Sequence, residues 1–174
     1  MNMDWKNLII NIPDYPKAGI NFKDITPLLA NGAGFKAAIE EMAMICERQN
    51  AIPDVLACPE ARGFIFAAAL AHRLGIGFIP LRKPHKLPRE VAHINYGLEY
   101  GEDCLEVHKQ DIKKGMRIMM VDDVLATGGT MHACMNLLQS LGAEIIGAMF
   151  LLELTALKGR EKLGTAAVYS LIQD

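Results

Sequence analysis

Residues 119–130 read Met-Met-Val-Asp-Asp-Val-Leu-Ala-Thr-Gly-Gly-Thr, and this stretch decides the fold. An apolar run ends at the acid pair Asp122 and Asp123, small residues occupy 126–130, and helical apolar spacing begins at Met131. This order is typical of a strand followed by a helix whose first N–H groups and positive dipole end face one point. Glycine lets the backbone approach an anion closely, and threonine hydroxyls can donate to its oxygens. A phosphate site beside two carboxylates, which suit hydroxyls or a cation, indicates a sugar phosphate.

Predicted strands and helices alternate along the rest of the chain. Apolar strands are predicted at 54–58, 77–81, 117–121, 144–153 and 167–171, helices at 4–10, 35–49, 62–74, 131–141 and 157–163, and a loop at 18–29. This pattern predicts a parallel sheet with helices on both faces. Ligands bind such sheets beyond the carboxyl ends of the strands, so we expect segments 59–63, 82–86 and 122–130 to converge on one cleft.

The composition fits a single globular domain. A chain of 174 residues with 51% hydrophobic and 22% charged residues can bury a full core. The net charge of −2 favours neither nucleic acid nor a membrane surface, and the longest apolar run, 145–152, is too short to span a bilayer. Four scattered cysteines without a Cys-x-x-Cys pair predict reduced thiols in a cytoplasmic protein, and the five histidines lack metal-ligand spacing.

A basic cluster directly follows the strand predicted at 77–81. Arg82, Lys83 and Lys86 lie in this cluster. Guanidinium and ammonium groups at a strand end suit pyrophosphate, although most such clusters are solvated basic turns. The position next to the predicted phosphate loop favours the pyrophosphate interpretation.

The polar segment 82–108 is long enough to be a lid. Gly97 and Gly101 flank Glu99 and Tyr100, so the tip can move, and an acid on a lid can exchange a proton with a substrate once water is excluded. A surface β-hairpin with solvated acids is the alternative.

Two further places carry possible binding residues. Phe22 lies in a glycine-containing loop and can stack on a flat heterocycle, although a lone aromatic is more often a core anchor. Glu60 and Arg62 lie at a strand-to-helix turn, where the arginine could equally form a structural ion pair.

Taken together, these motifs resemble those of a known enzyme family. The string 119–130 resembles the 5-phosphoribosyl-1-pyrophosphate (PRPP) motif of type I phosphoribosyltransferases and, without a lysine after Gly129, is unlike a Walker loop. Over 12–174 the chain is similar to the adenine phosphoribosyltransferases. The further motifs that carry this resemblance are Phe-Lys-Asp-Ile-Thr-Pro at 22–27, Arg-Gly-Phe at 62–64, Arg-Lys at 82–83, Lys-Leu-Pro at 86–88, Leu-Glu-Tyr-Gly at 98–101 and Glu-Leu-Thr-Ala-Leu-Lys-Gly-Arg at 153–160.

The resemblance implies an α/β, Rossmann-like type I phosphoribosyltransferase fold with a central, mostly parallel sheet flanked by helices. It implies a single domain over 1–174, with a small N-terminal hood at about 1–34, a core at about 35–174 and a flexible lid at about 84–108. It also implies a Mg²⁺-dependent homodimer that converts adenine and PRPP to AMP and pyrophosphate. From the net charge of −2 we expect no nucleic-acid and no membrane partner.

The resemblance further implies a role for each site residue. Glu99 would be the general acid/base at the purine, and Arg62 would lie by the base and pyrophosphate. Mg²⁺ would be carried by PRPP near the acid pair, with no direct protein ligand. Phe22 would stack on the base, with backbone groups near Asn21 and Lys23 at its edge, and Glu60 is a further expected substrate-binding residue. Arg82, Lys83 and Lys86 would bind pyrophosphate, and Tyr100 would close the lid. Asp122 and Asp123 would contact the ribose hydroxyls, and the 5′-phosphate would bind at Ala126, Thr127, Gly128, Gly129 and Thr130.

The sequence departs from the family pattern at Asn21, Pro59 and Ala61, where a small aliphatic residue, a glycine and a serine are usual. Hypoxanthine or xanthine is therefore the alternative base. A PRPP-sensing regulator without activity is the alternative from another functional class, because fold alone does not fix function. Such a regulator needs a nucleic-acid surface, and no basic cluster precedes the matched region.

Overall fold

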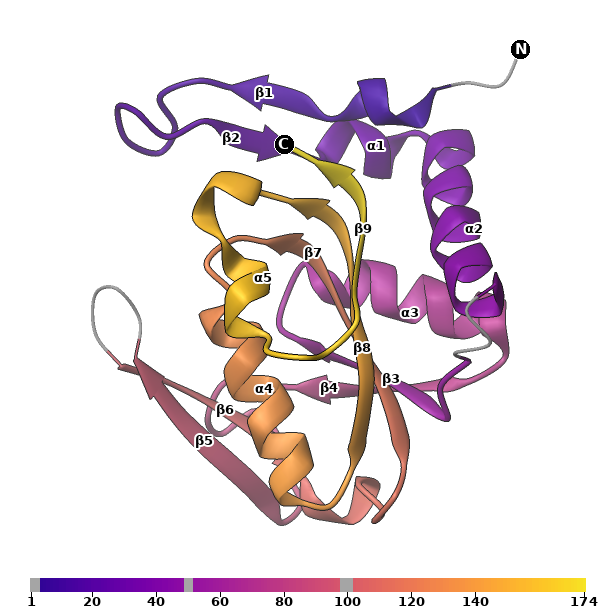
Figure 1. Ribbon diagram of the computed structural model, residues 1–174, viewed down its shortest axis with the longest axis vertical. Helices are drawn as coiled ribbons and strands as arrows, with labels where there is room; N and C mark the ends of the chain where they lie inside the picture. Colours follow the sequence, from indigo (N-terminus) through magenta and orange to yellow (C-terminus); the bar gives the residue numbers. More distant parts are fainter. Residues whose placement is uncertain (1–3, 49–51, 98–101) are drawn as a thin grey trace.

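The computed structural model describes residues 4–48, 52–97 and 102–174. Its centre is a sheet of five parallel strands in the order β4-β3-β7-β8-β9 (Figure 1). The strands are β3 (Val55–Pro59), β4 (Gly77–Leu81), β7 (Arg117–Leu125), β8 (Glu144–Glu153) and β9 (Val168–Gln173). The predicted α/β class with a central parallel sheet is confirmed, and β4 and β8 have the predicted bounds.

Helices cover both faces of this sheet. Helices α2 (Gly32–Arg48) and α3 (Gly63–Leu74) pack on one face, and α4 (Gly129–Ser140) packs on the other (Figure 1). Side chains of β7 alternate between the two cores: Met119 and Val121 face the α2–α3 layer, whereas Ile118 and Met120 face α4. Strands buried on both faces explain why their sequences are continuously apolar.

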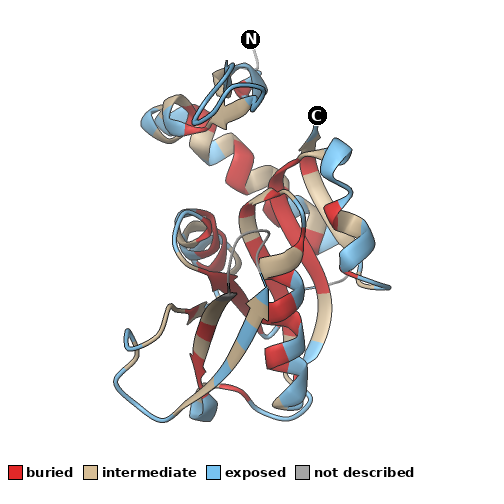
Figure 2. Ribbon diagram, turned by 90° about the vertical axis from the view of Figure 1, so that its left-hand side faces the viewer, coloured by how far each residue is buried: buried red, intermediate tan, exposed pale blue. Residues whose placement is uncertain are grey.

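The N-terminal residues form a separate small layer. It consists of the 3₁₀ turn η1 (Trp5–Leu8), the antiparallel pair β1 (Ile10–Ile12) and β2 (Phe22–Asp24), and α1 (Thr26–Ala30). We call this layer the hood. The predicted loop at 18–29 is wrong, because β2 and the start of α1 lie within it. Figure 2 shows the hood as mostly exposed, in contrast to the buried central strands.

The segment predicted as a lid contains a second hairpin. Strands β5 (Val91–Gly97) and β6 (Glu102–His108) pair antiparallel, and backbone hydrogen bonds between Arg82 and Glu106 join this hairpin to the end of β4. The hairpin alternative therefore describes the stem correctly. The predicted tip residues, Glu99 and Tyr100, lie outside the described residues.

Short turns complete the chain. The 3₁₀ turn η2 (Lys109–Asp111) follows β6, and the helix predicted at 157–163 is divided into η3 (Thr155–Leu157) and α5 (Gly159–Lys162). Cys46, Cys58 and Cys134 are buried, and all four cysteines are free thiols, as predicted.

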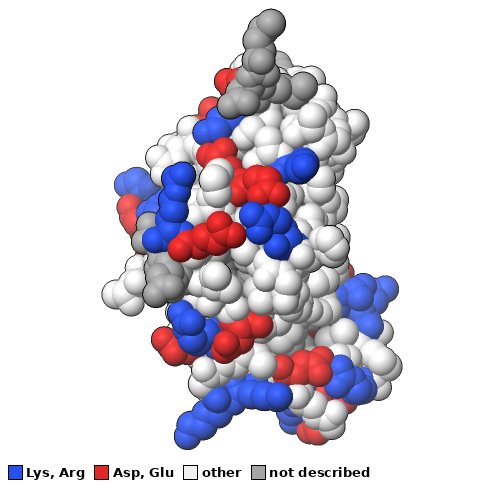
Figure 3. Space-filling model, turned by 90° about the vertical axis from the view of Figure 1, so that its right-hand side faces the viewer, with Lys and Arg blue, Asp and Glu red and all other residues white. Residues whose placement is uncertain are grey.

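The outer surface carries charges of both signs. On the face shown in Figure 3, acidic and basic side chains are intermingled. An example on the helical layer is Arg73 of α3, whose Nε donates to Glu40 of α2 at 2.8 Å. Within the described ranges, the model contains no helix with the length and apolarity that a bilayer span requires.

Candidate active site

The predicted phosphate loop lies between β7 and α4. Strand β7 continues to Leu125, so the acid pair lies inside the strand and not after its end, as the sequence suggested. Parallel pairing with β8 as far as Glu153 keeps these residues extended. Helix α4 begins at Gly129, two residues before the predicted start. Gly129 and Thr130 therefore belong to its first turn, where backbone N–H groups have no partner within the helix.

The loop, residues 126–128, lies against the start of α5. A Cβ on Gly128 would lie 2.4 Å from the carbonyl oxygen of Gly159, and one on Gly159 would lie 2.1 Å from that of Ala126. Gly128 also has φ = +78°, a conformation that side chains disfavour. Two glycines thus allow backbone to touch backbone, and α5 supports the loop from outside.

Of the two carboxylates beside the loop, Asp123 is buried and Asp122 is half-buried. Asp123 is 4% exposed, and its N–H donates to Oδ1 of Asp122 at 2.9 Å. Burial, and next the neighbouring charge of Asp123, raise the pKa of Asp122 well above its ordinary value. The pair therefore resists carrying two full negative charges when no cationic ligand is present.

Arg62 lies over this acid pair. Its Nε is 2.8 Å from Oδ2 of Asp123, close enough for an ion pair. The contact does not have hydrogen-bond geometry, so this oxygen has no hydrogen-bond partner among the described residues. The Arg62 guanidinium also lies 5.7 Å from the ring centroid of Phe22 in the hood. Arg62 thus connects the acid pair to the hood.

One cavity of about 350 Å³ connects these groups. Two of the three predicted segments, at the ends of β3 and β7, meet in this cavity as expected. Its lining consists of Glu60, Ala61, Arg62, residues 122–131 and Phe150.

The third segment, 82–86, does not line this cavity, which corrects the predicted convergence. Arg82 reaches it indirectly, because its Nε donates to Oε2 of Glu60 at 2.5 Å. Burial raises the pKa of Glu60, but the hydrogen bonds from Arg82 and Lys83 outweigh it and hold the pKa below its ordinary value. Lys83 instead pairs with Asp103 of β6, and Lys86 is exposed.

The hood holds a second cavity of about 300 Å³, lined by Ile12, Tyr15, Phe22, Asp24 and Thr26. The Tyr15 and Phe22 rings meet edge to face at 5.3 Å. Asn21 is exposed, and the Lys23 ammonium pairs with the Asp174 carboxylate at 2.7 Å.

Sequence reasoning missed four of these contact residues: Tyr15, Asp103, Phe150 and Gly159. Asp103, Phe150 and Gly159 reach their contacts through the tertiary arrangement of segments distant along the chain, whereas Tyr15 packs on the nearby Phe22. For Gly159 the sequence did offer a signal, because this residue lies in the family motif at 153–160.

Comparisons with known proteins agree with this geometry. Residues 27–169 match the family model described as the phosphoribosyl transferase domain. The chain is 50% identical over 173 residues to the adenine phosphoribosyltransferase of Lactobacillus delbrueckii subsp. bulgaricus, covering 99% of this chain and 98% of the relative. It is 51% identical over 170 residues to that of Clostridium perfringens, covering 98% of each.

Solved structures give the same result. The adenine phosphoribosyltransferase of Thermoanaerobacter pseudethanolicus superimposes with a TM-score of 0.94 at 49% identity, covering 100% of both chains. The Saccharomyces cerevisiae enzyme, solved in complex with an imino-altritol bisphosphate and adenine, gives a TM-score of 0.92 at 37% identity, covering 98% of this chain and 97% of that one. The chain therefore belongs to the phosphoribosyltransferase family and, within it, to the adenine phosphoribosyltransferases, the pentosyl transferases of purine salvage.

Proposed function

We propose that the 350 Å³ cleft transfers the 5-phosphoribosyl group from PRPP to adenine, giving AMP and pyrophosphate. The observation that carries this proposal is the meeting, in one cavity, of the first turn of α4 and the acid pair of β7. The first suits a phosphate and the second suits the ribose attached to it. Relatives that are about 50% identical over the whole chain support the same reaction.

The 5′-phosphate would bind at Ala126, Thr127, Gly128, Gly129 and Thr130. Free N–H groups at the start of α4 and the helix dipole favour an anion there. The hydroxyls of Thr127 and Thr130 can add hydrogen bonds. Contact with Gly159 fixes the loop before the ligand arrives, which lowers the entropic cost of binding.

Asp122 and Asp123 would face the ribose hydroxyls. When pyrophosphate leaves the anomeric carbon, positive charge develops on the ribose ring. A buried carboxylate such as that of Asp123 next to this charge stabilises it strongly, because little solvent screens their interaction. The same positive charge would favour full ionisation of Asp122, whose pKa is raised in the free protein.

Pyrophosphate would be held by Arg82, Lys83 and Lys86, with Glu60 orienting Arg82. Lys83 would have to exchange Asp103 for the ligand. The cleft also fits Mg²⁺, because carboxylate oxygens are its preferred donors together with substrate phosphates, and Oδ2 of Asp123 accepts no hydrogen bond from the described residues. When bound, Mg²⁺ neutralises charge on the leaving pyrophosphate.

Adenine would stack on Phe22, between the hood and Arg62. Backbone groups near Asn21 and Lys23 would contact the edge of the base. Glu99 would exchange the purine proton, and Tyr100 would help to close the lid over the site. We also propose that the chain acts as a homodimer in the cytoplasm, as the family resemblance implies.

The test is a spectrophotometric screen of adenine, hypoxanthine and xanthine with PRPP and Mg²⁺. Rapid AMP formation from adenine alone supports the proposal. A preference for either oxopurine would overturn the choice of base, and the departures at Asn21, Pro59 and Ala61 would then be the first residues to revert to the family pattern. No product with any base would remove the catalytic assignment.

The role of Glu99 needs its own variant. Glu99→Gln keeps the size of the side chain but cannot exchange the proton. Unchanged AMP turnover in this variant would exclude Glu99 as the general acid/base.

A further inference from the structure

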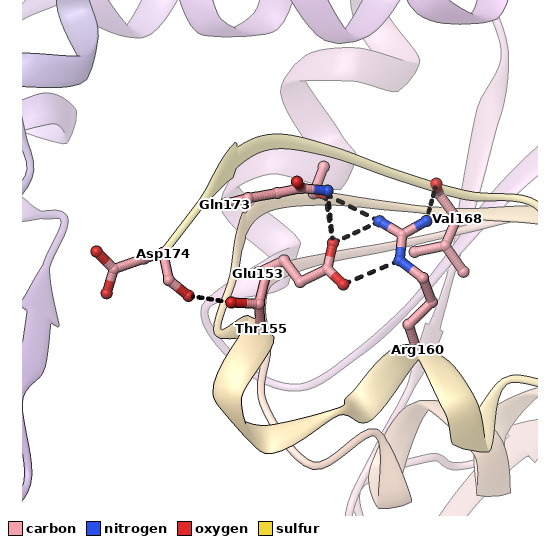
Figure 4. A network of polar contacts seen from close by, with 7 residues as sticks. Glu153, Thr155, Arg160, Val168, Gln173 and Asp174 are labelled. Carbon is pink, nitrogen blue, oxygen red and sulfur yellow. Dashed lines mark hydrogen bonds and ion pairs between the residues drawn. The ribbon is translucent and has the colours of Figure 1, made fainter.

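Helix α5 supports the phosphate loop, and Arg160 fixes α5. The Arg160 side chain, next to Gly159, makes a two-pronged contact with Glu153 at the end of β8: Nε donates to Oε1 at 2.9 Å, and Nη2 donates to Oε2 (Figure 4). Nη1 donates to the backbone carbonyl of Val168 in β9 at 2.8 Å. Three of its nitrogens thus tie the short helix to two neighbouring strands.

Glu153 is the buried end of this pair. Its side chain is 6% exposed and also accepts a hydrogen bond from Ser170 Oγ at 2.6 Å. Hydrogen bonding from Arg160 is the main cause that holds the pKa of Glu153 below its ordinary value. Because a buried carboxylate is costly without a partner, Glu153 holds Arg160 in this position.

Glu153 is also connected to the residue that enters the phosphate loop. It pairs in register with Leu125, the last residue of β7, and the N–H of the following Leu154 donates to the Leu125 carbonyl at 2.9 Å. The loop at 126–128 thus begins at a strand bonded to Glu153. Its outer side rests on Gly159, the neighbour of Arg160.

We propose that Arg160 and Glu153 are positioning residues that set the backbone of the phosphate loop through Gly159 and Leu125. Neither side chain lines the cleft, so both act through the loop. The inference rests on the proposed function in one respect, that residues 126–130 bind the 5′-phosphate. It predicts a defect confined to the ribose-phosphate half of the substrate.

The test compares Arg160→Gln with wild type in calorimetric binding of ribose 5-phosphate and in the KM values for PRPP and adenine. We expect about tenfold weaker ribose 5-phosphate binding and a similar rise in the KM for PRPP, because small misplacement of binding groups is costly. The KM for adenine should change less than twofold. Arg160→Lys, which keeps the charge but loses the two-pronged contact, should give an intermediate value.

Two reference variants make the outcome specific. Arg73→Gln removes an arginine–carboxylate pair between α2 and α3, away from the loop, and should leave all three quantities unchanged. Thr130→Val tests the phosphate site itself. If Thr130→Val and the loop-displacing Gly128→Ala both bind ribose 5-phosphate as wild type does, the assignment of the 5′-phosphate to residues 126–130 fails, and this inference fails with it.

A folded Arg160→Gln protein with wild-type ribose 5-phosphate affinity, alongside a weakened Thr130→Val protein, would overturn the positioning role alone. Equal rises in the KM values for PRPP and adenine would also overturn it, because they would indicate a general structural effect. If Arg160→Gln does not fold, Ser170→Ala decides, since it removes only one hydrogen-bond partner of the pair. In Ser170→Ala, an affinity for ribose 5-phosphate that is about twofold weaker, with an unchanged KM for adenine, supports the inference, and wild-type affinity for ribose 5-phosphate contradicts it.

Discussion

The phosphate side of the cleft and the hood side are built differently. On the phosphate side, the buried Asp123, a glycine-to-glycine backbone contact and the paired ends of β7 and β8 lie next to the loop. On the hood side, Trp5, Ile25 and Leu28 anchor the hood in the core, but every residue of β1 is exposed. Polar contacts such as Lys23 with Asp174 and Lys6 Nζ with the Leu171 carbonyl connect the hood to the C-terminal end of the chain.

This difference has a functional meaning. Segments with few buried contacts open at low free energy, whereas densely bonded ones hold their geometry. We infer that the phosphate side is a fixed site for the sugar phosphate and that the hood adjusts around the base. The predictions below test this division, beginning with the largest expected effect.

Gly128→Ala should be the most damaging substitution. The new Cβ would lie 2.4 Å from the Gly159 carbonyl oxygen at a φ of +78°, so the loop must move. We expect kcat/KM for PRPP to fall about a hundredfold or more, because misplacement by about 1 Å has effects of this size. Steady-state kinetics measures it.

Gly77→Ala in β4 is the control, since its nearest neighbour would be an ordinary 3.7 Å away. Near-normal PRPP kinetics in Gly128→Ala would show that the loop tolerates displacement. That result would contradict the inference that the phosphate side is a fixed site.

Arg62→Gln should affect both halves, because Arg62 contacts Asp123 on one side and Phe22 on the other. We expect kcat/KM for PRPP and for adenine each to fall about ten- to a hundredfold, the range for interactions of charged groups. Arg89→Gln, which removes a solvent-exposed pair with Asp111, is the control. A fall in kcat/KM for only one of the two substrates would mean that Arg62 does not connect the phosphate side with the hood side.

Phe22→Leu should change the hood side alone. Losing an aromatic face should raise the KM for adenine about two- to tenfold, while ribose 5-phosphate affinity stays at the wild-type value. Phe35→Leu removes an aromatic pair with Phe66 elsewhere and serves as the matched control. Weaker ribose 5-phosphate binding in Phe22→Leu would contradict the inference that the hood side and the phosphate side bind their ligands independently.

The smallest effect should be a pH dependence of stability on the phosphate side. The Arg160 hydrogen bonds lower the pKa of Glu153 below its ordinary 4.5, so the folded state favours the ionised form. This contribution is complete above pH 4.5 and disappears as the pH falls through the lowered value. Urea unfolding between pH 3 and 7 should therefore show a shallower acid slope for Glu153→Gln than for wild type. Identical slopes would show that the pair does not contribute in this way.

Local patterns predicted much of the fold. Strand β4 is an apolar run between Gly77 and the basic Arg82, strand β8 is one between Glu144 and Glu153, and both have the predicted bounds. Strand β2 was missed because it is only three residues long and is extended through antiparallel pairing with Ile10–Ile12, a pairing that the residues of β2 do not reveal by themselves. Strand β7 was predicted too short, since pairing with β8 carries it through the two polar residues Asp122 and Asp123.

The parts of the site that are adjacent in sequence were predictable, and the contacts between distant segments were not. The loop and the acid pair are adjacent in sequence, and their meeting in one cleft was expected. Contacts between Glu60 and Arg82, or between Gly128 and Gly159, depend on the tertiary arrangement and leave no local pattern. For that reason the basic segment 82–86 was placed in the cleft, whereas the structure connects it there only through Glu60.

The most direct measurement is a crystal structure of the protein with AMP bound. The account predicts that the phosphoryl oxygens accept hydrogen bonds from the backbone N–H groups of residues 127–130, with the ribose hydroxyls opposite Asp122 and Asp123. A phosphate bound at the basic segment 82–86, or a ribose turned away from the two acids, would contradict it.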